Sequence, residues 1–455
     1  MIQSKLIPGR RFGKLLLHDL VVFYTEENAM LLCPKTGTTL GVKKEIAEAV
    51  ERGSITSDFA FLMVQRALAE YENSRPVAVV TKHTLPNFFL VDMTKKCNLA
   101  CVYCFRETGT QYVSMSKEVL EKIGQALYRY HKKYPFLPIT IQAWGGEPVL
   151  ELESIVFLRN YCEAYGFHPD IVVESNGTLI TSAVAHSLYE NDIKIGISID
   201  GNAEVQNLQR SLCSGQPSSS LVEQGIKELR KAGYKQFGTI TVVTKYVAKQ
   251  LKEVFTYFTE ELRLNSVKLN MMRCTGENDD LALVADEIEG YTNELLDIMY
   301  QLYQQKVFIV EQNISQRLRN LQFRPNDNIC NSCGCHGGYK MVSIDTDGKV
   351  YPCELSDYPD HCIGEVGVVD FDEMVQEAIS KKHKYFADRR LEECRYCPWH
   401  YYCHGGCRAS GQYSCGDVTQ IDTTECAFNK ALYPKLVEIL LKDPDFANYL
   451  VSGEG

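Results

Sequence analysis

The sequence predicts an α/β protein built on a partial (β/α)6 TIM barrel, and two observations support this fold class. Between residues 88 and 273, six β-strand patterns alternate with helical patterns, and successive βα units of this kind form parallel sheets with right-handed crossovers. Six units are fewer than the eight that close a full barrel, so we expect an open one. Residues that act on a ligand are then expected at the C-terminal ends of the strands.

The six expected strands are short runs of mainly apolar residues, and helical patterns such as SKEVLEKIGQALYRYHKKY separate them. The runs are FFLVDM, ITIQAW, DIVVES, IKIGISID, TITVV and VKLNMM. We expect the barrel to occupy residues 88–280 and a helical bridge to follow over residues 281–329.

A separate small unit is expected over residues 1–75. Two β-rich runs, KLLLHDLVVFY and AMLLC, come first. A helix is expected over residues 42–52 with Gly53 as its C-cap, and a second helix is expected over residues 58–71. Strands followed by two or three helices predict a winged-helix-like domain.

The composition limits the class of protein. No apolar run approaches the roughly 20 residues of a membrane helix, and the N-terminal residues lack the pattern of a signal peptide. The net charge of −10, without a dense basic block, argues against nucleic-acid binding. We therefore expect a cytoplasmic protein without membrane or nucleic-acid partners. In that reducing compartment, 18 cysteines favour metal binding or catalysis over disulfides.

The sequence KKCNLACVYCF follows the first expected strand and places Cys97, Cys101 and Cys104 in a C-x3-C-x2-C spacing. A structural zinc site usually takes four ligands from two C-x2-C pairs. Three thiolates in one loop instead suit three corners of a 4Fe–4S cluster and leave one iron without a protein ligand. An open iron at the mouth of a barrel is where we expect a small chelating cofactor.

This loop and its position resemble the radical S-adenosylmethionine (SAM) superfamily. The resemblance implies that SAM chelates the open iron, that one electron from the cluster cleaves SAM, and that the resulting 5′-deoxyadenosyl radical abstracts hydrogen from a substrate. It also implies that SAM is bound by residues at the strand ends. The amino group would contact QAWGGEP, and the ribose and methionine groups would contact residues after the third and fourth strands. An arginine would bind the carboxylate, and a tyrosine would lie beside the adenine. The residues at these positions are Tyr103, Gly145, Gly146, Glu147, Ser175, Asn176, Ser198, Asp200 and Arg210. A core tyrosine and a solvated arginine are the alternatives for Tyr103 and Arg210.

The third region, residues 330–455, contains CRYCPWHYYCHGGC. Taken alone, this stretch is compatible with zinc ribbons. With its flanking cysteines, however, it resembles the SPASM domain, a C-terminal extension of radical SAM enzymes that modify peptides and proteins. The resemblance implies two auxiliary 4Fe–4S clusters, and therefore three clusters in all.

Carried over by position, the resemblance divides the cysteines between two clusters whose ligands interleave along the chain. One cluster would take Cys394, Cys397, Cys403 and Cys426, with Cys415 as a competitor for the last place. The other would take Cys335, Cys353, Cys407 and either Cys330 or Cys333, of which Cys330 has the better spacing. A hairpin turn at Asp347-Gly348 is expected to bring Cys335 and Cys353 together.

Two subclasses of SPASM enzyme are compatible with these features. Anaerobic sulfatase-maturating enzymes oxidise a Cys or Ser to formylglycine and typically carry an aspartate base directly after the YPC cysteine. Glu354 stands at that position in VYPCEL, so a catalytic base and a polar neighbour of the cluster are its two interpretations.

Enzymes of the second subclass mature ribosomally made peptides (RiPPs) by installing thioether or carbon–carbon crosslinks. Many begin with a winged-helix domain that binds a leader peptide as an added β-strand. Nearly ninety residues before the first cysteine loop fit this arrangement, and a simple cap on the barrel is the alternative.

The sequence therefore predicts a radical SAM/SPASM enzyme that modifies a precursor peptide, recognises its leader sequence, and takes electrons from a reductant such as flavodoxin or ferredoxin. The alternatives are a sulfatase-maturating enzyme and, outside the enzymes, a zinc-stabilised binding protein.

Overall fold

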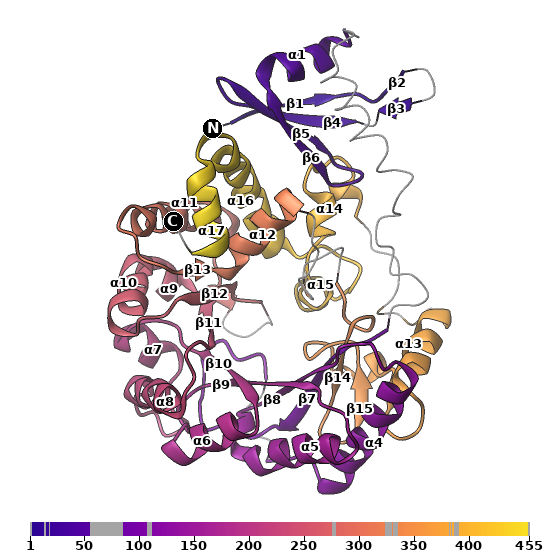
Figure 1. Ribbon diagram of the computed structural model, residues 1–455, viewed down its shortest axis with the longest axis vertical. Coiled ribbons are helices and arrows are strands. Elements are labelled where there is room, and N and C mark those ends of the chain that lie inside the picture. Colours follow the sequence, from indigo (N-terminus) through magenta and orange to yellow (C-terminus); the bar gives the residue numbers. More distant parts are fainter. Residues whose placement is uncertain are drawn as a thin grey trace.

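The computed structural model describes most of the chain. The described residues are 2–12, 15–17, 19–54, 85–106, 112–274, 279–323, 330, 335–381, 383, 385 and 391–453. The N-terminal unit lies at one end of the long axis and the barrel helices α4 (Lys117–Lys133) and α5 (Leu152–Ala164) lie at the other (Figure 1). None of the helices in these described ranges combines the length and the apolar character that spanning a membrane requires.

A parallel sheet forms the centre of the molecule, and its six principal strands coincide with the six expected from the sequence. They pair in chain order and in parallel. Their bounds are β7 (Phe88–Thr94), β8 (Thr140–Gly145), β9 (Asp170–Ser175), β10 (Ile193–Ser198), β11 (Gly238–Val243) and β12 (Ser266–Met271). The α/β class with a partial barrel is therefore confirmed.

The sheet is larger than the sequence predicted. The two-residue strand β13 (Val310–Glu311) extends it in parallel beyond β12. At the other edge, β14 (Met341–Ile344) pairs in parallel with β7, and β15 (Lys349–Tyr351) and β16 (Gly364–Glu365) follow as antiparallel neighbours. The C-terminal region is thus continuous with the barrel sheet.

Helices cover the outer face of the sheet (Figure 1). Helix α4 shows why these segments are helical: Ser116 caps its first turn by accepting from the Val119 backbone N–H, and Leu120, Ile123 and Leu127 are buried on one face. The other covering helices are α6 (Ser182–Glu190), α7 (Ala203–Gln209), α8 (Ser219–Ala232), α9 (Lys245–Lys249) and α10 (Leu251–Thr256).

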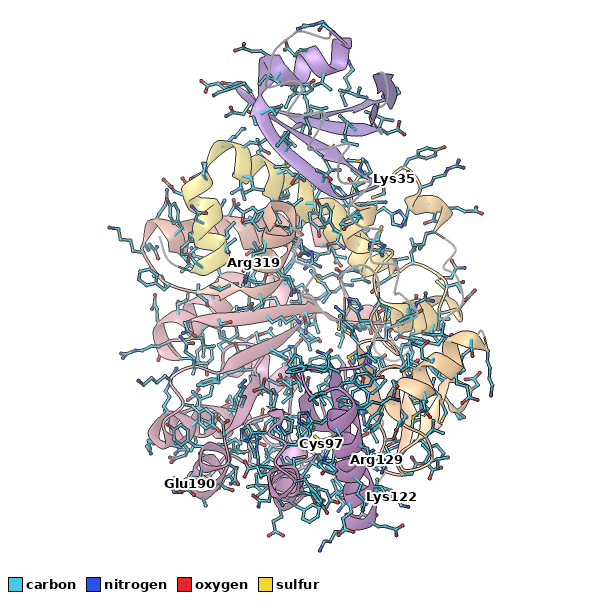
Figure 2. All side chains as sticks on the ribbon, turned by 45° about the vertical axis from the view of Figure 1, so that its right-hand side comes forward. Lys35, Cys97, Lys122, Arg129, Glu190 and Arg319 are labelled. Atoms are coloured by element: carbon cyan, nitrogen blue, oxygen red, sulfur yellow. The ribbon has the colours of Figure 1, made fainter. Side chains whose placement is uncertain are left out.

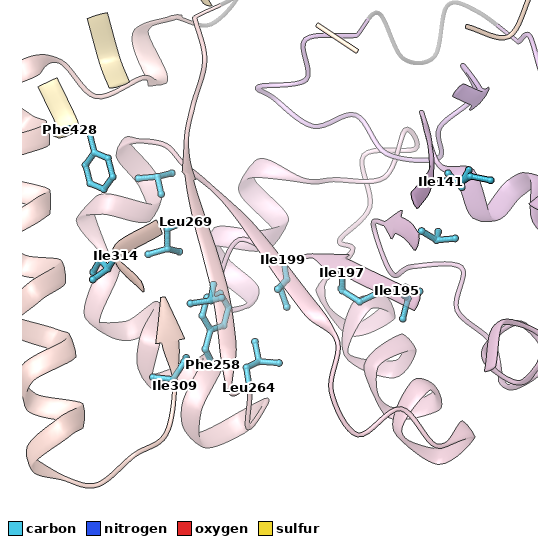
Figure 3. Packing of buried hydrophobic residues seen from close by; sticks show 14 of the residues in the cluster. Ile141, Ile195, Ile197, Ile199, Phe258, Leu264, Leu269, Ile309, Ile314 and Phe428 are labelled. Carbon is cyan, nitrogen blue, oxygen red and sulfur yellow. The ribbon is translucent and has the colours of Figure 1, made fainter. Parts of the chain in front are cut away.

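The two faces of the barrel strands differ in polarity. Isoleucines such as Ile195 and Ile197 alternate along β10 and belong to the main hydrophobic core (Figure 3). The residues between them point the other way, into the barrel interior, where polar side chains such as Ser198 line a cavity. Strand alternation thus separates the packing face from the face available to a ligand.

The described part of the N-terminal unit is an antiparallel sheet and one helix. The sheet has the order β1 (Gln3–Ile7), β4 (Leu20–Tyr24), β5 (Asn28–Cys33) and β6 (Thr38–Lys43). A short hairpin, β2 (Arg10–Phe12) with β3 (Leu15–Leu17), accompanies it. Helix α1 (Lys44–Arg52) ends at Gly53, which has a left-handed φ of 65°.

The expected first helix, residues 42–52, began too early because residues 38–43 pair with β5 as strand β6. That strand and β1 were not anticipated. The second expected helix, residues 58–71, lies outside the described residues.

Helices and the remaining hairpin complete the C-terminal half. Gly348, with a φ of 89°, forms the turn between β14 and β15, which confirms the expected hairpin. The helices are α11 (Ala285–Gln304), α12 (Gln312–Phe323), α13 (Phe371–Ser380), α14 (His400–Cys403), α15 (Arg408–Cys415), α16 (Thr423–Lys442) and α17 (Pro444–Ser452).

Candidate active site

The loop that follows β7, residues 95–104, is here called the cysteine loop, and backbone hydrogen bonds hold it on both sides. The Gly146 and Glu147 N–H groups donate to the carbonyls of Thr94 and Lys96 at 2.7 and 2.8 Å. On the other side, the Ala100 N–H donates to the Ser211 carbonyl at 2.9 Å. The loop is therefore fixed at the C-terminal end of the barrel, where Cys97 is labelled in Figure 2.

Two glycines make this close approach possible. A Cβ on Gly146 would lie 2.1 Å from the Lys96 carbonyl oxygen, and one on Gly145 would lie 2.2 Å from that of Thr94. Gly145 also has a φ of 136°, which favours glycine. The resemblance implies that the SAM amino group contacts this stretch, and the structure shows that the two glycines also allow it to pack against the end of β7 and the cysteine loop.

The thiols of Cys97, Cys101 and Cys104 line one cavity of about 470 Å³, here called the upper cavity. Burial, with a smaller contribution from the neighbouring thiols, raises the pKa of Cys97 to about 11 and that of Cys101 to about 12, although Arg210 opposes the rise at Cys101. Three thiolates in such a place need strong compensating positive charge, which iron in a 4Fe–4S cluster provides. The donor set fits a cluster. Among the described residues, no three His, Cys, Asp or Glu side chains lie close enough together to share a single metal ion.

A buried ion pair lies beside the cysteine loop. The Arg210 Nε donates to Asp200 Oδ2 at 3.0 Å, its Nη1 lies 4.0 Å from Cys101 Sγ, and its guanidinium covers the Tyr103 ring at 5.3 Å. The Tyr103 hydroxyl also donates to Asp200. Arg210 is 7% exposed and Asp200 is fully buried, so Arg210 is not a solvated surface residue.

Glu147 links the end of β8 to the end of β9 through hydrogen bonds. Its carboxylate accepts from the Asn176 N–H at 2.7 Å, the Ser175 hydroxyl at 2.8 Å and the Val149 N–H at 3.1 Å. Burial raises the pKa of Glu147 to about 7, although these donors lower it. Asn176 Nδ2 in turn donates to Asn98 Oδ1 at 2.9 Å and lies 3.9 Å from Cys97 Sγ.

The nine residues that the resemblance implies as SAM contacts therefore fall into two groups. Six of them line the upper cavity: Tyr103, Gly145, Gly146, Asn176, Ser198 and Arg210. The other three, Glu147, Ser175 and Asp200, are buried behind the cavity wall, where their hydrogen bonds hold the lining residues.

The C-terminal region supplies the opposite wall of the upper cavity. Cys330, Glu354 and Cys407 line it, and Glu354 Oε2 is buried without a hydrogen-bond partner among the described residues. Burial lowers the pKa of Arg273, another lining residue, but the nearby thiols of Cys407 and Cys330 and the Glu354 carboxylate outweigh this and raise it. Cys333 lies outside the described residues.

Two further cysteines lie next to this wall. The Tyr385 hydroxyl lies 3.2 Å from Cys335 Sγ and 3.9 Å from Cys353 Sγ. Burial, together with Cys335 and Cys407, raises the pKa of Cys353 well above its usual value. The structure thus brings together a first auxiliary set, Cys330, Cys335, Cys353 and Cys407.

A second auxiliary set surrounds a separate small cavity of about 20 Å³. Its members are Cys394, Cys397, Cys403 and Cys426. Burial raises the pKa of Cys403 to about 12. Cys415, the competitor for the last place, is exposed and does not line this cavity.

Sequence reasoning missed the charged residues of the barrel interior. Glu174 on β9, Lys268 on β12 and Arg273 after β12 all line the upper cavity. The available signal was a charged residue inside an otherwise apolar strand, as in DIVVES and SVKLNM.

Comparisons with known proteins match these features. Residues 91–258 match the radical SAM superfamily, and residues 335–398 match SPASM, an iron–sulfur cluster-binding domain. The cysteine-type anaerobic sulfatase-maturating enzyme of Clostridium perfringens (strain 13 / Type A) is 26% identical over 332 residues, which cover 69% of this chain and 86% of that protein.

Two solved structures share the fold. The structure of anSMEcpe with bound AdoMet and Cp18Cys peptide has a TM-score of 0.66 at 22% identity and covers 78% of this chain and 99% of its own. Streptococcus suis SuiB bound to precursor peptide SuiA has a TM-score of 0.54 at 16% identity and covers 88% of this chain and 96% of its own.

The two family matches span the barrel that presents the cysteine loop and the region that contributes the C-terminal cysteines. They imply 4Fe–4S clusters and SAM as cofactors and exclude a purely zinc-stabilised binding protein. The chain therefore contains a radical SAM domain and a C-terminal SPASM domain, and it is an enzyme.

Proposed function

We propose that this enzyme modifies a ribosomally synthesised precursor peptide, forming a thioether or carbon–carbon crosslink. One observation carries the proposal: the cysteine loop and the first auxiliary set face the same upper cavity. A substrate in that cavity lies between the place where a radical is generated and a second redox group. This arrangement suits a reaction that removes two hydrogen atoms from a peptide.

The cysteine loop would hold one 4Fe–4S cluster through Cys97, Cys101 and Cys104. With SAM bound, this cluster supplies the 5′-deoxyadenosyl radical. Asp200 fixes the Arg210 guanidinium through its Nε, which leaves the rest of that group facing the cavity and placed for the SAM carboxylate. Tyr103, held by the same aspartate, would lie beside the adenine of SAM.

The two auxiliary sets would each hold one further 4Fe–4S cluster, giving three in all. The first set reaches the upper cavity through Cys330 and Cys407, which places it to receive an electron from the substrate. We expect flavodoxin or ferredoxin as the reductant.

The N-terminal unit, residues 1–75, would bind the leader of the precursor. Strand β1 pairs with β4 alone among the described strands, and its residues Gln3, Ser4, Lys5 and Leu6 are exposed. An open strand edge of this kind accepts a peptide strand through backbone hydrogen bonds. In support, the structure of SuiB bound to its precursor peptide matches 88% of this chain, whereas the structure of anSMEcpe matches 78%.

Anaerobic sulfatase maturation is the second candidate. The Clostridium perfringens relative favours it. Glu354, which directly follows Cys353 and lines the upper cavity, also favours it, because its Oε2 has no hydrogen-bond partner in the described part of the chain. In this alternative, Glu354 takes the proton of a substrate thiol or hydroxyl.

The test is anaerobic co-expression with candidate peptides encoded near the gene, and with a sulfatase, followed by mass spectrometry. We expect a loss of two hydrogen atoms per crosslink in a short peptide and roughly twelve iron atoms per chain. A variant with Cys97, Cys101 and Cys104 all changed to Ala is the control and should leave every peptide unmodified. Modification of the sulfatase alone would establish the second candidate instead.

A further inference from the structure

The barrel has a second cavity at the end opposite the cysteine loop. This lower cavity of about 970 Å³ is lined by residues near the N-terminal ends of β9 to β13, among them Lys194, Gly238 and Val310. Gln236, Gly238 and Asn265 on its wall are exposed, so it opens to solvent. The lower cavity is not part of the site described above.

Of the residues that the structure describes, Glu174 is the one that lines both cavities. It shares a face of β9 with Asn176, two residues nearer the cysteine loop, a separation of about 6.6 Å along a strand. Gly196 on β10 makes room for the carboxylate, because a Cβ there would lie 2.3 Å from Glu174 Oε2. That oxygen is buried and has no hydrogen-bond partner among the described residues.

Several charged residues line the two cavities, and Lys268 is the one that shifts the pKa of Glu174. Lys268, from β12, lines the upper cavity with it, and Lys194, from β10, lines the lower one. Burial raises the pKa of Glu174 to about 7, and Lys268 opposes this rise. Both the protonated and the ionised forms are therefore populated near neutral pH.

Glu147 has the same elevated pKa but a different environment. Both of its carboxylate oxygens already accept hydrogen bonds from the protein, and it lines neither cavity. Glu354 lies on the opposite wall of the upper cavity and does not line the lower one. Glu174 alone among these three carboxylates faces both the reaction space and a route to water.

We propose that Glu174 accepts the proton released when the substrate is oxidised and passes it to water in the lower cavity. This inference rests on the proposed function. In thioether formation, the substrate C–H loses a hydrogen atom to the 5′-deoxyadenosyl radical. The carbon radical then bonds to the thiol sulfur, and the S–H bond breaks. One electron goes to an oxidised iron–sulfur cluster and one proton goes to the Glu174 carboxylate.

The first test is Glu174→Gln in the reconstituted full-length enzyme, with the precursor peptide as substrate. We expect 5′-deoxyadenosine to form still, while crosslinked product per 5′-deoxyadenosine falls by roughly 100-fold. Glu190→Gln, the same change at a 62% exposed side chain on α6 (Figure 2), is the matched control and should leave the ratio unchanged. A wild-type ratio in Glu174→Gln would overturn the proposal.

The pH profile separates proton transfer from a structural role. Glu174 accepts a proton only when ionised, so wild-type crosslinking should rise with pH across its pKa, near 7. Lys268→Met removes the cation that favours the ionised form and should shift this rise to higher pH. The rise should be absent in Glu174→Gln. A profile that is unchanged in both variants would contradict the assignment.

A second measurement needs no peptide. The infrared carboxyl band of Glu174, assigned by difference from Glu174→Gln, should shift promptly when the holoenzyme is moved into D2O. Gly238→Phe should slow this exchange, since a Cβ at Gly238 meets no atom within 4 Å and the ring extends into the lower cavity. Exchange that is unaffected by this block would exclude the route. If the wild-type enzyme modifies no peptide, the proposed function is wrong. The exchange measurement would still test whether Glu174 exchanges protons with the lower cavity.

Discussion

The two auxiliary sets contain four cysteines each but occupy different surroundings. The first set reaches the upper cavity of about 470 Å³ that it shares with the cysteine loop, whereas the second surrounds about 20 Å³. The second set instead lies against the N-terminal sheet, because Trp399, which lines its cavity, stacks on Phe23 of β4 at 5.2 Å. We therefore propose that the first set serves substrate chemistry and that the second anchors the N-terminal unit.

The largest expected effect comes from Cys407→Ala. Although Cys407 follows Cys403 closely in sequence, it faces the upper cavity with Cys330. We expect loss of roughly four of roughly twelve iron atoms and no detectable crosslinking, while SAM cleavage to 5′-deoxyadenosine continues.

Iron analysis combined with EPR spectra of the separate clusters checks this prediction. Cys415→Ala, an exposed cysteine on α15, is the control and should keep full iron content. If Cys407→Ala removed the cluster of the second set instead, the division between the two sets would be wrong.

Trp399→Ala should have the next largest effect, and on stability rather than chemistry. Trp399 is 4% exposed and lies between Phe23 and Tyr433, stacking on the latter at 5.0 Å. Truncating a buried aromatic residue costs about 3–5 kcal/mol. We expect that loss in the free energy of unfolding, together with faster hydrogen exchange in β4 and β5.

Tyr396→Ala tests whether the effect is specific, because Tyr396 is 77% exposed in the same stretch. That variant should unfold like the wild type. Equal exchange rates for β4 in wild type and Trp399→Ala would show that the second set does not anchor the N-terminal unit.

Glu354→Gln should have a smaller effect on catalysis than Glu174→Gln. In the crosslinking reaction the proton leaves through Glu174, so we expect Glu354→Gln to retain more than roughly a tenth of the product per 5′-deoxyadenosine. The same assay that monitors Glu174→Gln measures this. A loss of roughly 100-fold in Glu354→Gln alone would favour the sulfatase-type base.

The part of the fold that sequence predicted best is the part with local periodicity. The six long strands alternate with amphipathic helices, and each pattern is complete within a short window. Strand β13 has two residues, too few for a pattern, and β14 joins β7 across more than 240 residues of sequence. Such pairings depend on tertiary packing, which a local pattern does not encode.

The candidate site shows the same limit. The resemblance to the SPASM domain, carried over by cysteine order, implied how the C-terminal cysteines divide, because that order can be read in the sequence. Glu174 and Lys268 were missed because their importance depends on which face of each strand points into the barrel. Arg210 was left open between a surface and a ligand-binding role, and its burial follows from Asp200, ten residues earlier.

The smallest expected effect concerns a single hydrogen bond between the region of the second set and the N-terminal unit. The Tyr402 hydroxyl donates to the buried Gly37 carbonyl at 2.6 Å, across the contact between the second set and the N-terminal sheet. Tyr402→Phe keeps the ring and removes the donor, which should cost about 1–2 kcal/mol in the free energy of unfolding. Chemical denaturation of the holoenzyme measures it. Because the ring packing against Tyr433 remains, iron content and product ratio should match the wild type, and a loss of iron would mean that this contact also maintains the second set.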